Sequence, residues 1–194
     1  MSPWWARDIS VVRRTSPLDQ QVGSVKDASE RREWSGGAVP GELVEVALEL
    51  LRTNPYGFLT TVDDGRPHTR LVQHVGVDDD GTVWIGTSPA SRKAAEVSRG
   101  PHVSYAVEDR AAFAYVCLQA DAEVVDDVAE RVARWEEGLK SFFPDGPAGN
   151  DFVLIRLTPH TVELMDFSRR IHPDPYGLVP AAAEHRDGSW STTR

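Results

Sequence analysis

The residues with the clearest chemical potential stand at positions 86–95, in the sequence GTSPASRKAA. The pattern predicts the end of a strand, a tight turn and the start of a helix, with Ser88 as the N-cap and Pro89 in the first helical position. Arg92 and Lys93 then fall in the first turn, where free backbone N–H groups and the helix dipole already attract negative charge. Cations and hydroxyl groups at a helix start favour an anion site, most plausibly for a phosphate.

Two interpretations of this segment stay open on the local pattern. In the first, a helix simply begins here, and the side chains of Arg92 and Lys93 are solvated. In the second, both cations hold a phosphate, and Thr87 and Ser91 donate hydroxyl hydrogen bonds to it. Cations near a helix start oppose the dipole and require a compensating anion, which favours the second interpretation.

Short strands separated by turns surround this segment, and few helices interrupt them. Alternating apolar and polar residues predict strands over 55–62, 67–77, 82–87, 101–107, 113–125, 152–157 and 161–165. The last two strands are expected to be joined by a turn at 158–160. Many short strands with few helices indicate a mainly β protein, a six- to seven-stranded antiparallel split β-barrel with a few inserted helices.

Two further helices are expected besides the one that follows Pro89. One starts at Gly41 and should cover an end of the barrel with the apolar face formed by Leu43, Val46, Ala47, Leu50 and Leu51. The other is capped by Asp126 or Asp127 and runs to Phe142. Three regions follow from this organisation: an N-terminal extension over 1–40 that is flexible or packed on the surface, a barrel domain over 41–167 and a C-terminal tail over 168–194.

Composition narrows the class of protein. The chain has 194 residues and a net charge of −9, which disfavours nonspecific binding to nucleic acid. No apolar run is long enough to span a membrane, and we expect no signal peptide. The single cysteine, Cys117, is expected to be a buried small hydrophobic side chain rather than a nucleophile. These features are typical of a cytoplasmic protein.

The order of the elements resembles the pyridoxamine 5′-phosphate oxidase family, the FMN-binding split barrels, in its general-stress-protein-like branch. That family has an R-x-V strand, an acidic turn ending in Gly, a strand ending in Thr, an S-R-K-A helix and a strand beginning N-P-R-V-S. The corresponding segments here are Arg70–Val72, Asp78–Gly81, Thr87, Ser91–Val97 and Gly100–Ser104. The resemblance spans residues 55–166.

The resemblance implies an FMN cofactor and a homodimer with flavin sites at its interface, each built from both chains. Arg70 and Lys93 would bind the phosphate, with Arg92 next. Tyr115 would reach the partner's flavin from the fifth strand, at a position where the enzyme that gives the family its name has Gln. The full set implied for the cofactor is Arg70, Leu71, Val72, Gln73, Gly86, Thr87, Ser91, Arg92, Lys93 and Tyr115.

The substrate is less well defined by the residues. Arg170 and His172 resemble a short R-L-H motif that contacts substrate in the same enzyme, although a solvated turn explains them equally well. The lysine with which that enzyme holds a substrate phosphate is replaced here by Val75, and its later helix carries Glu136 and Glu137 instead of an arginine set. Carboxylates repel a phosphate, so we expect a small-molecule substrate other than pyridoxamine 5′-phosphate.

Three functions stay open at this point. The first is an FMN-dependent oxidoreductase, the second a reductase that uses a deazaflavin coenzyme, and the third a non-enzymatic flavin-binding stress protein. No metal site is predicted, because His68 and His74 lie too far apart on one strand to chelate an ion. The Asp78–Gly81 run lacks the spaced ligands of a calcium loop and is expected to be a turn.

Overall fold

The computed structural model describes residues 40–171 and 179–193, so most of the expected N-terminal extension, His172 and Arg194 lie outside the described residues. The helices are α2 (Pro40–Thr53), α3 (Arg92–Arg99), α4 (Val128–Ala133) and the 3₁₀ helix η2 (Glu137–Ser141). The strands are β1 (Tyr56–Asp63), β2 (Arg66–Val77), β3 (Val83–Thr87), β4 (His102–Asp109), β5 (Ala114–Val125), β6 (Val153–Asp166), β7 (Ala181–Arg186) and β8 (Ser189–Thr193).

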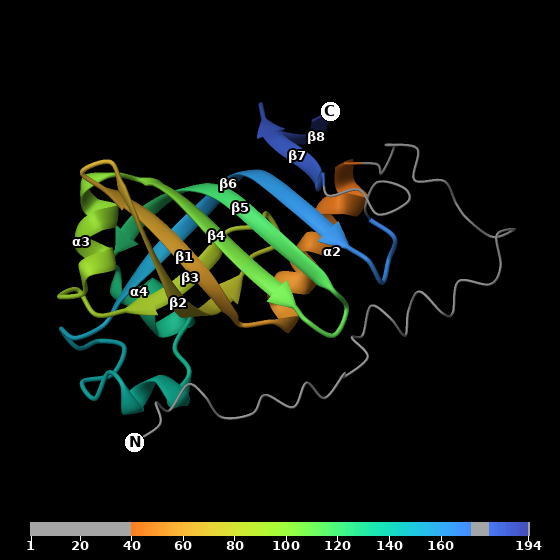
Figure 1. Cartoon of the computed structure of the whole chain (residues 1–194). Helices are drawn as coiled ribbons and strands as arrows, with labels where there is room; N and C mark the ends of the chain where they lie inside the picture. Colours follow the sequence, from red (N-terminus) through yellow and green to blue (C-terminus); the bar gives the residue numbers. More distant parts are fainter. Residues whose placement is uncertain (1–39, 172–178, 194) are drawn as a thin grey trace, which may run out of the picture. The chain divides into compact units, whose positions relative to one another are not determined.

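Six of the strands close into an antiparallel barrel. They follow the order β3-β2-β1-β4-β5-β6, and β3 pairs with β6 to complete the circle (Figure 1). β7 and β8 then extend the sheet from the far half of β6. The predicted mainly β, antiparallel barrel with few helices is therefore confirmed.

β6 differs from the sequence expectation of two short strands with a turn at 158–160. It is one continuous strand, which pairs with β3 through residues 153–157 and with β7 through residues 161–164. Pro159 lies opposite Ala120 and Thr161 opposite Gln119, so His160 is an extra residue of β6 in its ladder with β5. A proline is tolerated at such a bulge because the ladder there does not need its missing N–H. The proline was thus misinterpreted as the centre of a turn.

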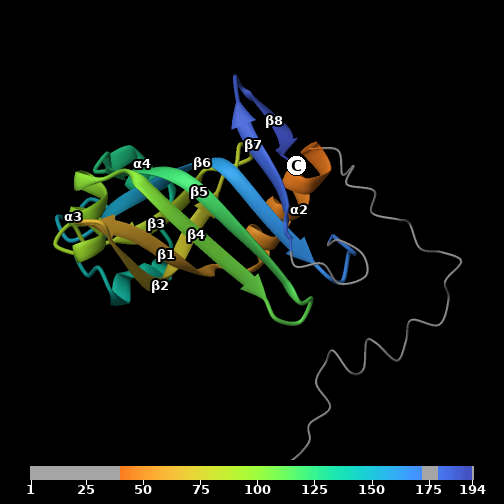
Figure 2. The same cartoon turned by 45° about the horizontal axis from the view of Figure 1, so that its top comes forward.

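The segment beyond residue 167, expected as a tail, contributes β7 and β8. The side chains of Ala181 and Ala183 are buried, while Glu184 between β6 and β8 is half-buried. Alanine has low strand propensity, so the sequence of this segment gave little indication of a strand. Figure 2 shows the two strands on the same side of the barrel as α2, which they contact.

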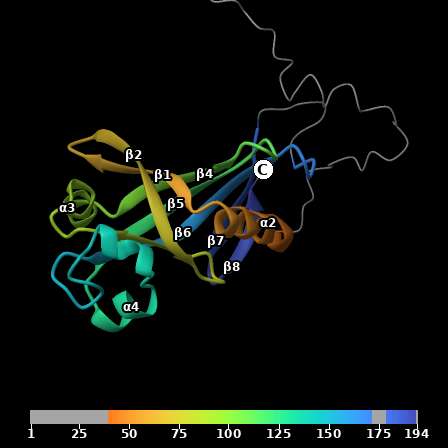
Figure 3. The same ribbon diagram turned by 90° about the horizontal axis from the view of Figure 1, so that it is seen from below.

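Helix α2 confirms the expected helix that covers one end of the barrel. Leu43, Ala47, Leu50 and Leu51 are buried as predicted, whereas Val46 is only partly buried and Val44 and Leu48 join the core. Figure 3 shows α2 at one end of the barrel and α3 and α4 toward the other. Within the described ranges, no helix is both long enough and apolar enough to span a membrane.

The helix predicted from Asp127 to Phe142 is broken in the structure. Asp127 does cap α4, because its Oδ1 accepts the N–H of Glu130 at 2.9 Å. The helix ends after Ala133, where the Arg134 guanidinium stacks 3.8 Å above the Trp84 ring and bonds to Asp78. These tertiary contacts override the helical periodicity.

Candidate functional site

The start of α3 brings two hydroxyl groups together. Ser91, not Ser88, is the N-cap: its Oγ accepts the N–H of Ala94 at 3.3 Å, and its own backbone is extended. Ser88 accepts a hydrogen bond within the preceding turn, so the helix begins one turn later than the sequence predicts. Thr87 donates to Ser91 Oγ over 3.1 Å. Both hydroxyls implied for the phosphate therefore lie directly at the helix start.

Lys93 is the cation of this helix start that has no carboxylate partner in the described part of the chain. It is half-buried, and among residues 40–171 and 179–193 no carboxylate lies within ion-pair distance of it. Burial, and after it the charge of the nearby Arg70 guanidinium, lower the pKa of Lys93. An anion placed between the two cations would relieve this repulsion.

Arg70 extends from β2 into a polar cluster around Glu96, a residue of α3 that the sequence analysis did not single out. Its Nη2 lies 2.6 Å from Glu96 Oε2, and its Nη1 donates to Thr61 Oγ1 at 2.7 Å. Arg92 Nε also reaches Glu96, at 3.2 Å from Oε1. Glu96 thus supplies a counter-ion for Arg70 and Arg92, whereas Lys93 has none within residues 40–171 and 179–193.

Glu96 is fully buried yet held in its charged form. Burial alone raises the pKa of this carboxyl, but hydrogen bonds from Thr61, His68 and Arg70 and the charge of Arg70 outweigh burial and bring the pKa to about 2. The spacing of Arg92 and Glu96, four residues apart on a helix, was the one signal in the sequence that pointed to this pair. Its partners on β1 and β2 are distant in the chain and carried no such signal.

The depressed pKa of Glu96 predicts how the stability of the protein falls in acid. Because the folded pKa of about 2 lies below the ordinary value of 4.5, this stabilisation is present above pH 4.5 and is lost as the pH falls toward 2. We expect Glu96→Gln to have a lower Tm than the wild type at pH 7 but to lose less Tm between pH 4.5 and 2. Thermal unfolding followed by circular dichroism measures this, with Glu130→Gln as the control, since the Glu130 carboxylate is exposed and also pairs with an arginine, Arg134. If the Tm of Glu96→Gln falls with pH in parallel with that of the wild type, the depressed pKa of Glu96 is wrong.

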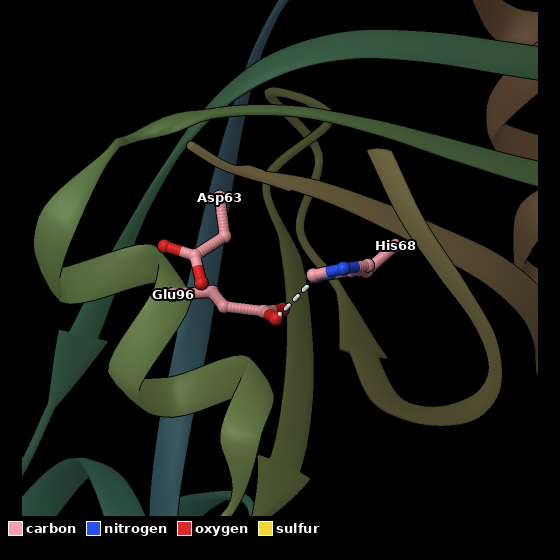
Figure 4. Close-up of side chains that lie close together, drawn as sticks. All are labelled: Asp63, His68 and Glu96. Atoms are coloured by element: carbon pink, nitrogen blue, oxygen red, sulfur yellow. Dashed lines mark hydrogen bonds and ion pairs between the residues drawn. The ribbon is translucent and has the colours of Figure 1, made fainter. Parts of the chain in front are cut away.

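Asp63, His68 and Glu96 form the one group of potential metal ligands within the described ranges, with their ligand atoms within 4.8 Å of one another (Figure 4). His68 Nδ1 is already hydrogen-bonded to Glu96 Oε1 at 2.6 Å. Asp63 pairs with Arg99 at 3.0 Å, and Glu96 pairs with Arg70 and Arg92. Three arginines neutralise the two carboxylates, so the electrostatics favour an ion-pair cluster over a site for a cation.

The other residues implied for the cofactor do not share one surface, and those on β2 lie on both faces of that strand. Val72 is buried inside the barrel, whereas Leu71 is exposed and Gln73 is half-buried on the outer side of β2. Packing alone explains the glycine at position 86, since a Cβ there would lie 2.8 Å from the Phe152 ring. Tyr115 lies on β5, three strands from β2 in either direction around the barrel. Within one chain, Tyr115 is separated from the Arg70 cluster.

Arg170 lies far from this cluster within the same chain. It is exposed in a turn with a positive φ of 58°, and its N–H donates to Phe167 O. The neighbouring Arg169 bonds to Glu49 of α2 at 2.7 Å, so the turn lies at the α2 end of the barrel, opposite α3. The structure does not bring Arg170 to the helix start, and its role as a substrate contact stays a prediction.

A cavity of about 180 Å³ lies beside the end of β2. Its lining residues are Arg52, Pro55, His74, Val75, Gly76, Val77 and Glu136. Val75 and Glu136, compared above with substrate-phosphate positions, thus meet in one cavity, but Glu137 does not line it. The cavity also contains Arg52, which the sequence did not place there and which pairs with Asp79 at 2.7 Å. His74 hydrogen-bonds Tyr105 OH at 2.8 Å, and burial lowers its pKa, which keeps the imidazole neutral at pH 7.

The outer face of β1 and β2 exposes large apolar side chains. Tyr56, Phe58 and Val62 of β1 and Leu71 of β2 are each about half exposed, and Phe58 pairs directly with Leu71 across the two strands. The face also carries Gln73 and adjoins Ala106 of β4. Contiguous exposed apolar surface of this kind is typical of a protein–protein contact.

Fold and site together define a small barrel protein with a cation-rich helix start at one end. Residues 42–172 match the family model described as pyridoxamine 5′-phosphate oxidase like. This match covers most of the chain, and the protein belongs to that family. The resemblance inferred from the R-x-V strand and the S-R-K-A helix is therefore confirmed.

Individual relatives support the same assignment. General stress protein 26 of Bacillus subtilis (strain 168) is 27% identical over 130 residues, which cover 64% of this chain and 89% of the relative. A protein related to general stress protein 26 from Clostridium acetobutylicum superimposes with a TM-score of 0.59 at 18% identity, covering 68% of this chain and 92% of that one. An FMN-binding protein related to pyridoxamine 5′-phosphate oxidase from Nostoc punctiforme PCC 73102 superimposes with a TM-score of 0.60 at 19% identity. The match covers 81% of this chain and 97% of that one. At these identities the two structures show a common fold.

Proposed function

We propose that this protein binds FMN through its 5′-phosphate at the start of α3 and is an oxidoreductase acting on a small molecule. The observation that carries the proposal is Lys93, a half-buried cation beside Arg70 with no carboxylate paired to it among residues 40–171 and 179–193. A phosphate monoester is close to a dianion at neutral pH and needs at least two cations with several hydrogen-bond donors. The Ser91 hydroxyl at the same helix start supplies such a donor, and Thr87 holds it in place by donating its own O–H to Ser91 Oγ.

Each residue of the site has a distinct task in this proposal. Lys93 and Arg70 bind the phosphate from α3 and β2, while Thr87 and Ser91 orient it against the free N–H groups of the helix start. The backbone of residues 70–73 supports the ring system. When bound, FMN supplies the electron-transfer chemistry, and the protein contributes binding, orientation and electrostatics.

We further propose that two copies pair through the apolar face of β1 and β2. This face carries Phe58 of β1, and it includes Leu71 and Gln73 of the strand proposed to support the flavin. Pairing about a two-fold axis is the commonest symmetry of oligomers. It would also allow Tyr115, distant from the site within its own chain, to serve the site of its partner.

The proposed dimer predicts a mass in solution of twice the chain mass of 21.4 kDa. We expect Phe58→Asp, which buries an unpaired charge in the contact, to give a monomer and to weaken FMN binding. Val132→Asp on α4 replaces an equally exposed apolar residue outside this face and should leave the dimer intact. Light scattering coupled to size exclusion measures both variants. A monomeric wild type that still binds FMN tightly would contradict the shared site.

A second candidate is a flavin-binding stress protein without catalytic turnover, and its support is the similarity to general stress protein 26. The absorption spectrum of the purified protein, reconstituted with FMN, is the first test. A flavin spectrum supports either FMN function, and substrate-dependent reduction of the bound flavin then separates the enzyme from the non-enzymatic protein. A protein that rejects FMN but binds a deazaflavin coenzyme would instead be a deazaflavin-dependent reductase.

A further inference from the structure

We infer that Glu96 is a positioning residue of the phosphate site: its buried carboxylate holds the Arg70 guanidinium in the orientation that binds the phosphate. The inference rests on the proposed function, because it concerns the same site. It adds a residue that touches neither phosphate nor flavin and acts only through Arg70.

Three acceptors fix the Arg70 guanidinium, and one of them is the backbone oxygen of Leu59, 3.3 Å from Nη1. Glu96 Oε2 accepts from Arg70 Nη2 at 2.6 Å, and Thr61 Oγ1 accepts from Arg70 Nη1 at 2.7 Å. Thr61 in turn donates to the same Glu96 oxygen at 2.5 Å, which closes a three-membered ring of hydrogen bonds. Glu96 and Thr61 are fully buried and the Arg70 side chain is 18% exposed. A long arginine side chain that is otherwise free to adopt many rotamers is thereby held in one.

The charges make this anchor necessary. Arg70 and Lys93 repel each other, as the lowered pKa of Lys93 indicates. Without the Glu96 oxygen as an acceptor for its Nη2, Arg70 would lower its energy by turning toward solvent, away from Lys93. Glu96 removes that tendency and leaves Lys93 free to bind an external anion.

The charge of the cluster also fits a phosphate monoester. Arg70, Arg92 and Lys93 contribute three positive charges and Glu96 one negative charge, which leaves a formal charge of +2 with His68 neutral. The neighbouring Asp63–Arg99 pair adds no net charge. A charge of +2 equals in magnitude the charge of a phosphate dianion, so the site is balanced when a dianion is bound.

Two substitutions of Glu96 separate positioning from charge. Glu96→Ala removes the anchor of Arg70, and we expect FMN affinity to fall about tenfold or more, the effect of losing one well-oriented charge-assisted hydrogen bond. Glu96→Gln keeps an oxygen that accepts from Arg70 Nη2 and should restore affinity to within about threefold of the wild type. Riboflavin lacks the phosphate, and its affinity should be unchanged in both variants.

Titration of the full chain with FMN, riboflavin and inorganic phosphate tests the inference, with flavin fluorescence and ³¹P NMR as the readouts. Glu130→Ala breaks a more exposed arginine–glutamate pair, between α4 and its C-cap Arg134, and is the control. If Glu96→Ala does not fold, Thr61→Val tests the second anchor of Arg70 and should give the same selective loss of FMN.

The outcomes distinguish this inference from the proposed function. Unchanged FMN binding in folded Glu96→Ala, an equal loss of FMN and riboflavin, or a Glu96→Gln variant as weak as Glu96→Ala would each overturn positioning by Glu96. If the wild type binds inorganic phosphate but not FMN, the proposed cofactor is wrong, and loss of phosphate binding in Glu96→Ala still supports the role of Glu96. If it binds neither, both fail.

Discussion

Lys93→Ala is expected to weaken FMN binding by about ten- to a hundred-fold. The substitution removes the one cation of the helix start that has no carboxylate partner in the described part of the chain, and it leaves a near-dianion facing Arg70 alone. Losing one charge-assisted hydrogen bond to a phosphate costs about 1.5–3 kcal/mol, which corresponds to that range of affinity. Arg70→Ala should give a similar loss and also leave Glu96 buried without its closest cation.

Fluorescence titration of the apo-protein with FMN measures both variants. Lys140→Ala, which removes an exposed lysine of η2, is the control and should bind FMN like the wild type. Riboflavin affinity should change little in Lys93→Ala, because the lost contact is to the phosphate. If neither Lys93→Ala nor Arg70→Ala alters FMN binding, the phosphate lies elsewhere.

Pyridoxamine 5′-phosphate is expected to be oxidised poorly or not at all, even when the protein is saturated with FMN. The cavity beside β2 presents Val75 and the Glu136 carboxylate, and its one arginine, Arg52, is paired with Asp79. Arg52, Asp79 and Glu136 leave this region with a formal charge of −1, so a substrate phosphate would be repelled. A neutral or cationic small molecule suits these charges better.

The measurement is formation of pyridoxal 5′-phosphate, followed by its absorbance, with flavin-saturated protein. Glu136→Gln removes the repelling carboxylate and should raise the affinity for pyridoxamine 5′-phosphate if the cavity is the substrate site. Turnover near 1 s⁻¹ or faster by the wild type, an ordinary rate for an enzyme, would contradict the prediction. It would also favour Arg170 and His172 as substrate ligands.

Local periodicity predicted most of this fold, and it failed where distant residues decide the structure. The strand ranges and α2 follow from alternation and from the apolar face of a helix, both of which are properties of neighbouring residues. Pro159 was misinterpreted because β6 accommodates it through a bulge at His160, which only the pairing with Gln119 and Ala120 of β5 defines. The break in α4 depends on Trp84, which stacks on Arg134. Neither partner is visible from the local segment.

The candidate site was likewise predictable where its residues form a local motif, and not where its residues meet from distant parts of the chain. The helix start with Ser91, Arg92 and Lys93 and the R-x-V strand carry recognisable motifs, so their residues were identified from the sequence. Glu96 was missed because a charged residue on a short helix is usually solvated, and its burial depends on Arg70 and Thr61 from two distant strands. A buried charge becomes evident only when its partners are placed around it.

The central claim is that the start of α3 and Arg70 bind the phosphate of FMN, and calorimetric titration of the wild-type apo-protein with FMN and with riboflavin tests it most directly. The account predicts one FMN per chain and an affinity for riboflavin at least about tenfold lower, since riboflavin differs only in lacking the phosphate. Equal affinity for the two flavins, or no binding of FMN, would contradict it.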